Sequence, residues 1–96
     1  MLDLNKIKNI LTDGKSQLIE KYCIAAIGQF GSLARDDFNE NSDIDIIVDF
    51  YKPIGIEFIT LAEELEAKLN RKVDLVSRKG IKPKYFKVIE PEIIYI

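Results

Sequence analysis

The chain has 96 residues, of which 47% are hydrophobic and 31% charged, and its formal net charge at pH 7 is −2. These values predict one small globular domain, residues 1–96, and the acidic balance argues against a general nucleic-acid binder. No apolar stretch approaches the ~20 residues of a membrane span, and the amino end lacks a signal-peptide pattern. Histidine is absent and Cys23 is the single cysteine, which excludes imidazole bases and the usual zinc sites and favours a reducing cytoplasm.

The predicted elements alternate between helices and strands. Apolar residues recur at helical spacing over residues 4–22, and the turn signal at residues 12–14 predicts a break or kink in that helix. The elements that follow are strands at 24–30 and 43–50, a helix at 56–70, a strand at 73–76, a helix from Pro83 to Pro91, and a final strand or helical turn at 93–96. This order predicts an α/β fold with a small mixed sheet that helices cover mainly on one face.

Two aspartates open the second predicted strand. Side chains alternate along a strand, so Asp43 and Asp45 share one face while Ile44 and Ile46 can be buried on the other. Carboxylates side by side repel each other unless a cation or a proton lies between them. A hard divalent cation with oxygen ligands, Mg²⁺ above all, fits such a pair. The alternative interpretation is a solvated strand end, which is also common for Asp-x-Asp.

A Gly-Ser turn precedes the aspartates by one short loop. Gly31 ends the first apolar run, and Ser32 can cap a short helix that extends through Arg35. Backbone N–H groups and a hydroxyl at such a turn suit phosphate oxygens. Metal carboxylates facing a phosphate cradle indicate phosphoryl or nucleotidyl transfer. Arg35 can reach a phosphate or can equally pair with the acidic residues that follow it.

The combination resembles the minimal nucleotidyltransferases, a branch of the DNA polymerase beta-like nucleotidyltransferases. The residues that carry the resemblance are Phe30-Gly31-Ser32-Leu33-Ala34-Arg35 and Ser42-Asp43-Ile44-Asp45-Ile46-Ile47-Val48, with ten residues between Ser32 and Asp43. The family usually continues after the arginine with glycine and glutamate. Here Asp36 and Asp37 stand there and add negative charge near the expected triphosphate site.

Asp74 lies between Val73 and Leu75 in the third predicted strand. A carboxylate in a short apolar strand is costly to bury without a partner. It either faces water at the strand end or joins the first two aspartates through bound metal. The resemblance implies the second role, because Asp74 matches the family's third acidic position.

The resemblance also implies a role for each site residue. Asp43 and Asp45 would bridge two Mg²⁺ ions, and Asp74 would hold one of them and accept the acceptor's proton. The Gly31-Ser32 turn, helped by Ser42, would cradle the phosphates of ATP. The implied reaction transfers AMP to a tyrosine of a partner HEPN-domain toxin, which makes the chain an antitoxin.

Two other functions remain open from the sequence. The chain can be a binding module that masks its toxin sterically, with little catalysis of its own. It can also be a small-molecule nucleotidyltransferase whose acceptor lies at an oligomer interface. The three candidate metal ligands argue against the first alternative, and the small size argues against the second.

Overall fold

The structure is a computed structural model that describes residues 4–31 and 43–96 of the chain. Its elements are α1 (Leu4–Tyr22), β1 (Ile24–Phe30), β2 (Ile44–Phe50), α2 (Glu57–Leu69), β3 (Val73–Ser77), a 3₁₀ turn η1 (Arg78–Gly80), α3 (Pro83–Ile89), a 3₁₀ turn η2 (Glu90–Glu92) and β4 (Ile94–Tyr95). The short helix predicted after Gly31 lies outside the described residues. Within these ranges, no helix is long and apolar enough to cross a membrane.

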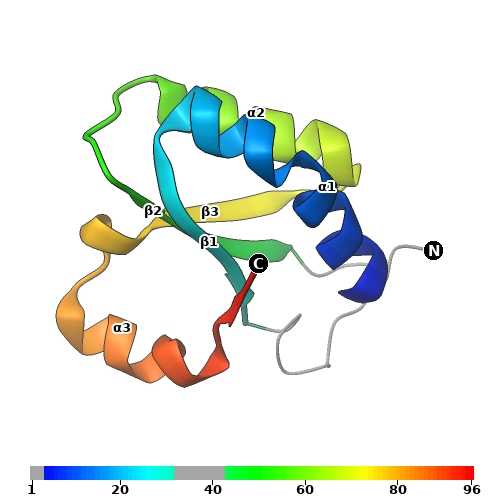
Figure 1. Cartoon of the computed structure of the whole chain (residues 1–96). Coiled ribbons are helices and arrows are strands. Elements are labelled where there is room, and N and C mark those ends of the chain that lie inside the picture. Colours follow the sequence, from blue (N-terminus) through cyan, green and yellow to red (C-terminus); the bar gives the residue numbers. More distant parts are fainter. Residues whose placement is uncertain (1–3, 32–42) are drawn as a thin grey trace.

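The four strands form one mixed sheet in the order β3-β2-β1-β4 (Figure 1). β1 is antiparallel to both β2 and β4, whereas β2 and β3 are parallel and are joined through α2. A parallel pair needs such a crossover, because its strands cannot be linked by a tight turn. The predicted α/β fold with a small mixed sheet is therefore confirmed.

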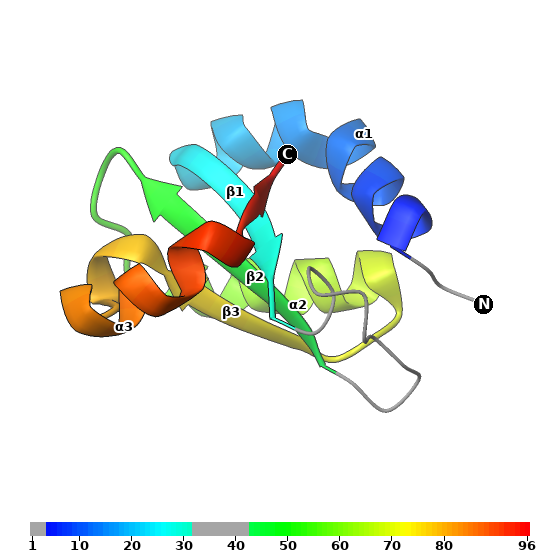
Figure 2. The ribbon, with the colours of Figure 1, turned by 90° about the horizontal axis from the view of Figure 1, so that it is seen from below.

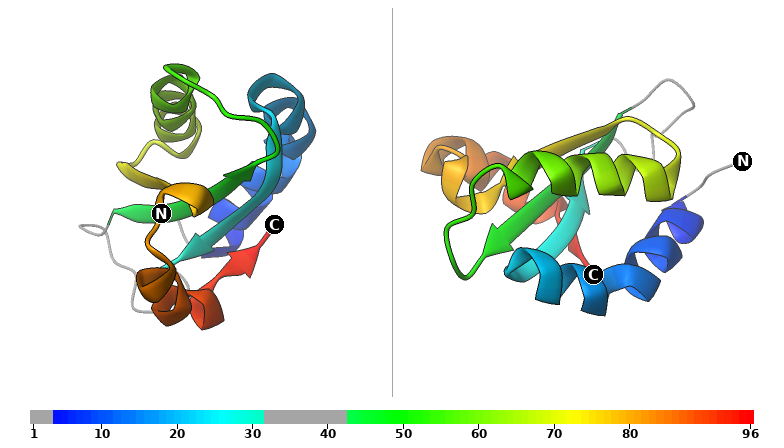
Figure 3. Two further views of the ribbon diagram at one scale, coloured as in Figure 1. Left: turned by 90° about the vertical axis from the view of Figure 1, so that its left-hand side faces the viewer. Right: turned by 90° about the horizontal axis from the view of Figure 1, so that it is seen from above.

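The alternation along β2 sorts its side chains between two layers. Ile44, Ile46 and Val48 are fully buried in the larger core, which α1 and α2 share with the sheet. Ile47 packs with residues of α3 on the other face, and Asp45 lines a cavity there with Tyr85 and Ile89 of α3. Figure 3 shows α3 on the side of the sheet opposite to α1 and α2. The second, smaller core on that face contains Phe30, Ile47, Ile81, Phe86 and Ile89. Two helices thus cover one face, while α3 covers part of the face that carries Asp45.

The helix α1 is one continuous element from Leu4 to Tyr22, so it is not broken at residues 12–14. Its axis bends along its length, as Figure 2 shows. Thr12 donates its hydroxyl to the Lys8 carbonyl at 2.7 Å, which satisfies the side chain inside the helix rather than in a turn. Gly14 is buried, and a Cβ there would lie 3.4 Å from Lys68 Nζ of α2. Gly14 therefore lies next to the end of the Lys68 side chain, where α1 and α2 are neighbours.

The carboxyl end is the outer strand of the sheet, as its apolar residues predict. Ile94 pairs with Gln29 of β1, and the Ile96 backbone N–H donates to the Ile27 carbonyl at 2.9 Å. Lys15 of α1 donates to the Ile96 carbonyl at 2.6 Å. These contacts hold β4 and η2 against the end of β1 (Figure 2).

Candidate functional site

Asp45 and Asp74 are direct neighbours on adjacent strands. The parallel register of β2 and β3 pairs Asp45 with Asp74, and neighbouring strands lie ~4.8 Å apart. Both side chains line one cavity on the α3 face, Asp45 half-buried and Asp74 exposed. Two carboxylates at this spacing repel each other, and a bound cation removes that repulsion.

Gly31 forms the turn directly after β1 and touches the same carboxylate. Its φ of +71° lies in the left-handed region, which side chains with a Cβ rarely adopt. A Cβ at this position would collide with Asp45 Oδ2 and would stand 3.0 Å from Asp45 Cγ. Both the turn and the close approach of the Asp45 carboxylate therefore require glycine.

The carboxylates and the turn share a cavity of about 290 Å³, which is open to solvent on one side. Its lining residues are Phe30, Gly31, Asp45, Asp74, Val76, Tyr85, Ile89 and Glu92. The sheet supplies the two aspartates, and α3 with η2 supplies Tyr85, Ile89 and Glu92. Figure 2 shows the ribbons of α3 and η2 in front of the sheet. One part of the cavity is acidic and the other is apolar.

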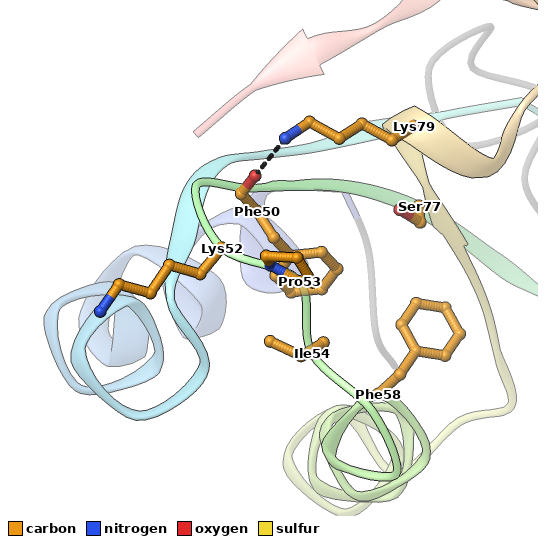
Figure 4. A pocket seen from close by; sticks show the side chains of 7 residues that line it. All are labelled: Phe50, Lys52, Pro53, Ile54, Phe58, Ser77 and Lys79. Atoms are coloured by element: carbon orange, nitrogen blue, oxygen red, sulfur yellow. Dashed lines mark hydrogen bonds between the residues drawn. The ribbon is translucent and has the colours of Figure 1, made fainter.

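A second cavity of about 360 Å³ lies at the opposite end of β2 (Figure 4). Its lining is mainly apolar, with Phe50 and Phe58 as its aromatic walls. Of its two lysines, Lys79 donates to the Phe50 carbonyl at 3.0 Å, and Lys52 points away from the cavity. No carboxylate is among the described residues that line this larger cavity, so the smaller cavity with Asp45 and Asp74 is the candidate site.

This arrangement agrees with a comparison against protein families, in which residues 5–96 match the model of the nucleotidyltransferase domain. The chain belongs to the nucleotidyltransferase domain family. The family's motif of a Gly-Ser turn followed by Asp-x-Asp is present at residues 31–45.

Individual members of the family agree over most of the chain. The protein adenylyltransferase MntA of Thermococcus cleftensis is 42% identical over 97 residues, which cover 100% of this chain and 98% of the relative. A solved structure described as a minimal nucleotidyltransferase superimposes with a TM-score of 0.85 at 29% identity, over 97% of this chain and 95% of the other. A chain from the complex of the tri-AMPylated Shewanella oneidensis HEPN toxin with its MNT antitoxin matches with a TM-score of 0.62 at 25% identity, over 96% and 66%.

Seven site residues were predicted from the sequence. The structure brings three of them together at the cavity, namely Gly31, Asp45 and Asp74. Asp43 stands exposed directly before β2 and does not line the cavity. Ser32, Arg35 and Ser42 lie outside the described residues. Among residues 4–31 and 43–96, no three His, Cys, Asp or Glu side chains converge closely enough to hold one metal ion by themselves.

Sequence reasoning missed the wall that faces the carboxylates. Tyr85 adjoins the buried Phe86 in α3, but Tyr85 itself is 57% exposed and lines the cavity. Ile89 and Glu92 follow it at helical spacing and line the same cavity. The spacing is visible in the sequence, whereas the face of the sheet on which α3 packs is not.

Proposed function

We propose that the chain transfers AMP from ATP to a tyrosine hydroxyl of a HEPN-domain toxin and so acts as its antitoxin. The observation that carries this proposal is the pairing of Asp45 with Asp74 beside the Gly31 turn. Full-length similarity to a protein adenylyltransferase supports the nature of the transferred group. Similarity to a chain of an AMPylated toxin–antitoxin complex supports the nature of the acceptor.

The Gly31-Ser32 turn and Ser42 bind the β- and γ-phosphates in this proposal. A turn after a strand presents backbone N–H groups to anionic oxygens, and hydroxyl donors add charge-assisted hydrogen bonds. Arg35 contributes a positive charge to phosphate binding in this proposal. The α-phosphate then lies over Asp45, between the turn and Asp74.

The donor set fits Mg²⁺, because this ion prefers oxygen ligands and commonly binds through one or two carboxylates together with substrate phosphates. Asp43, Asp45 and Asp74 would hold two ions, with substrate oxygens completing the coordination. When bound, the ions neutralise the triphosphate and lower the pKa of the acceptor hydroxyl.

The transfer itself is an in-line displacement. The tyrosine oxygen forms a bond to the α-phosphorus, the bond to the β-phosphate oxygen breaks, and pyrophosphate leaves. Asp74 accepts the phenolic proton, since the chain has no histidine that can act as the base. We place the reaction in the cytoplasm, where ATP and Mg²⁺ are supplied.

A second candidate is a masking module that inhibits its toxin by covering it. The likeness to a chain of a toxin–antitoxin complex favours this candidate as well, since a stable complex can block a toxin without chemistry. Masking is reversible and stoichiometric because it obeys mass action. Covalent transfer persists after the proteins separate, and one molecule of the chain can modify many toxin molecules.

The decisive experiment incubates an excess of the HEPN toxin with a catalytic amount of the chain, ATP and Mg²⁺, and then separates the two proteins. Adenylyl transfer predicts that all of the toxin is inactivated and stays inactive after separation. Masking predicts protection limited to one stoichiometric equivalent and full recovery of the toxin. An omission of ATP serves as the control, since only transfer depends on it.

A further inference from the structure

The candidate cavity has an acidic end and an apolar wall, and each suits a different part of ATP or of the acceptor. The acidic end, at Asp45 and Asp74, suits phosphates bridged by cations. The apolar wall consists of Phe30, Val76, Tyr85 and Ile89. Phosphate groups are excluded from such a wall because an ion loses its hydration there without compensation. A flat aromatic ring is the natural occupant.

The cavity residues of α3 and η2 form a stripe that leads away from the Gly31 turn. Glu92 lies two residues before Ile94, which pairs with Gln29 near the end of β1, so Glu92 belongs to the Gly31 end of the cavity. Tyr85 lies in the first turn of α3 and Glu92 ends η2, with Ile89 between them in the stripe of residues that lines the cavity. Tyr85 therefore lies at the end of the stripe away from the Gly31 turn.

The geometry of the displacement indicates whether the ring next to Tyr85 is adenine or the acceptor tyrosine. The attacking and leaving oxygens lie on opposite sides of the phosphorus in an in-line reaction. With the β- and γ-phosphates at Gly31, the leaving pyrophosphate occupies that side, and the acceptor arrives from the other. The side away from Gly31 is the side of Tyr85.

We infer that Tyr85 seats the aromatic ring of the acceptor tyrosine against the apolar wall formed by Val76 and Ile89, and so contributes to the choice of a tyrosine as acceptor. This inference rests on the proposed function and adds to it a residue that selects the acceptor. Aromatic pairs prefer offset or edge-to-face contact, which an exposed ring on a helix can offer without rearrangement of the backbone. The 57% exposure of Tyr85 leaves its ring accessible to a partner.

The test measures initial rates of AMP transfer to the toxin for the unaltered chain and for Tyr85→Ala, Tyr85→Phe and Tyr51→Ala. Tyr51 is a matched control, since it is 56% exposed and lies outside the cavity. Each variant is assayed with the toxin varied at saturating ATP and with ATP varied at saturating toxin. ATP binding without toxin is measured by calorimetry.

Tyr85→Ala is expected to raise the KM for the toxin by roughly 5- to 30-fold, as truncation of an aromatic anchor does, while the KM and affinity for ATP stay unchanged. Tyr85→Phe keeps the ring and is expected to behave like the unaltered chain, as is Tyr51→Ala. A rise in the KM for ATP instead would assign the wall to adenine and overturn the inference. An equal loss in Tyr85→Phe would assign the effect to the hydroxyl and overturn it as well.

The inference and the proposed function fail in different ways. If the unaltered chain transfers no AMP, the proposed function is contradicted and the inference falls with it. If transfer is robust and Tyr85→Ala leaves both KM values unchanged, only the inference is contradicted.

Discussion

Asp45 and Asp74 are opposite residues of two parallel strands, and both carboxylates face one cavity. The half-buried Asp45 also touches the Gly31 turn so closely that no side chain fits at that position. A fold gains no stability from two like charges on neighbouring strands, because they repel each other. The pairing of the two carboxylates is therefore the observation from which we propose a cation site.

Asp45→Asn is expected to lower AMP transfer more than ~100-fold, because the variant loses a preorganised charge at the reacting phosphate. The melting temperature should be unchanged or slightly higher, since the repulsion with Asp74 is relieved. Asp49→Asn is the matched control, because Asp49 lies on the same strand and face but does not line the cavity. Transfer rates and thermal melts of both variants check this prediction. Near-parental transfer by a folded Asp45→Asn would contradict the assigned role.

Gly31→Ala is expected to abolish transfer and to destabilise the fold by about 1–2 kcal/mol, the cost of a left-handed backbone with a Cβ. The added methyl group also displaces the Asp45 carboxylate. Gly55→Ala serves as the control, since a Cβ there meets nothing nearer than Glu57 Oε2 at 3.5 Å. Urea unfolding and transfer rates separate the two effects. Full activity of Gly31→Ala would show that the close approach is not needed.

The sequence predicted the sheet well because its signals are local. Alternation along Ile44–Phe50 assigned one face to the core and left Asp45 on the other, as observed. The break predicted near Gly14 does not occur, because α1 continues through this buried position where it packs in the folded chain. Tyr85 and Glu92 were missed for the same reason. Their cavity exists only once α3 has folded back beneath β2 and β3.

The helices α1 and α2 are joined by a polar cluster that predicts a pH dependence of stability. Glu64 accepts hydrogen bonds from Lys21 at 2.9 Å and from the Tyr22 hydroxyl at 2.8 Å. These bonds, that from Lys21 first, lower the pKa of the Glu64 carboxyl. A carboxyl with a lowered pKa stabilises the fold above its unfolded-state pKa of ~4.3, and the gain is lost as the pH falls through the folded-state pKa.

Glu64→Gln is accordingly expected to lower the free energy of unfolding by about 0.5–1 kcal/mol at pH 7, a modest value because the cluster is partly exposed. The difference in the free energy of unfolding between Glu64→Gln and the unaltered chain should shrink toward zero below pH 4. Glu63→Gln, on an exposed neighbour, should have little effect at either pH. Urea unfolding at pH 7 and pH 3.5 measures both. A difference that is the same at the two pH values would exclude this origin.

Divalent cations are expected to be needed for nucleotide binding. A ligand that binds only the folded state raises the melting temperature, so ATP with Mg²⁺ should raise it more than either alone. Asp45→Asn should lose most of this combined shift, because it removes one of the carboxylates that we propose as cation ligands. Thermal melts with and without EDTA provide the measurement. An equal shift with ATP in EDTA would show that the phosphates bind without a cation.

The intact mass of the HEPN toxin after incubation with the chain, ATP and Mg²⁺ tests adenylyl transfer most directly. A mass increase by whole AMP units, located on tyrosine by fragmentation, is the predicted result. The increase should be absent with EDTA and with Asp45→Asn, and should be retained with Asp49→Asn. An unmodified toxin that is nevertheless fully inhibited by the chain would contradict the transfer of AMP and establish masking in its place.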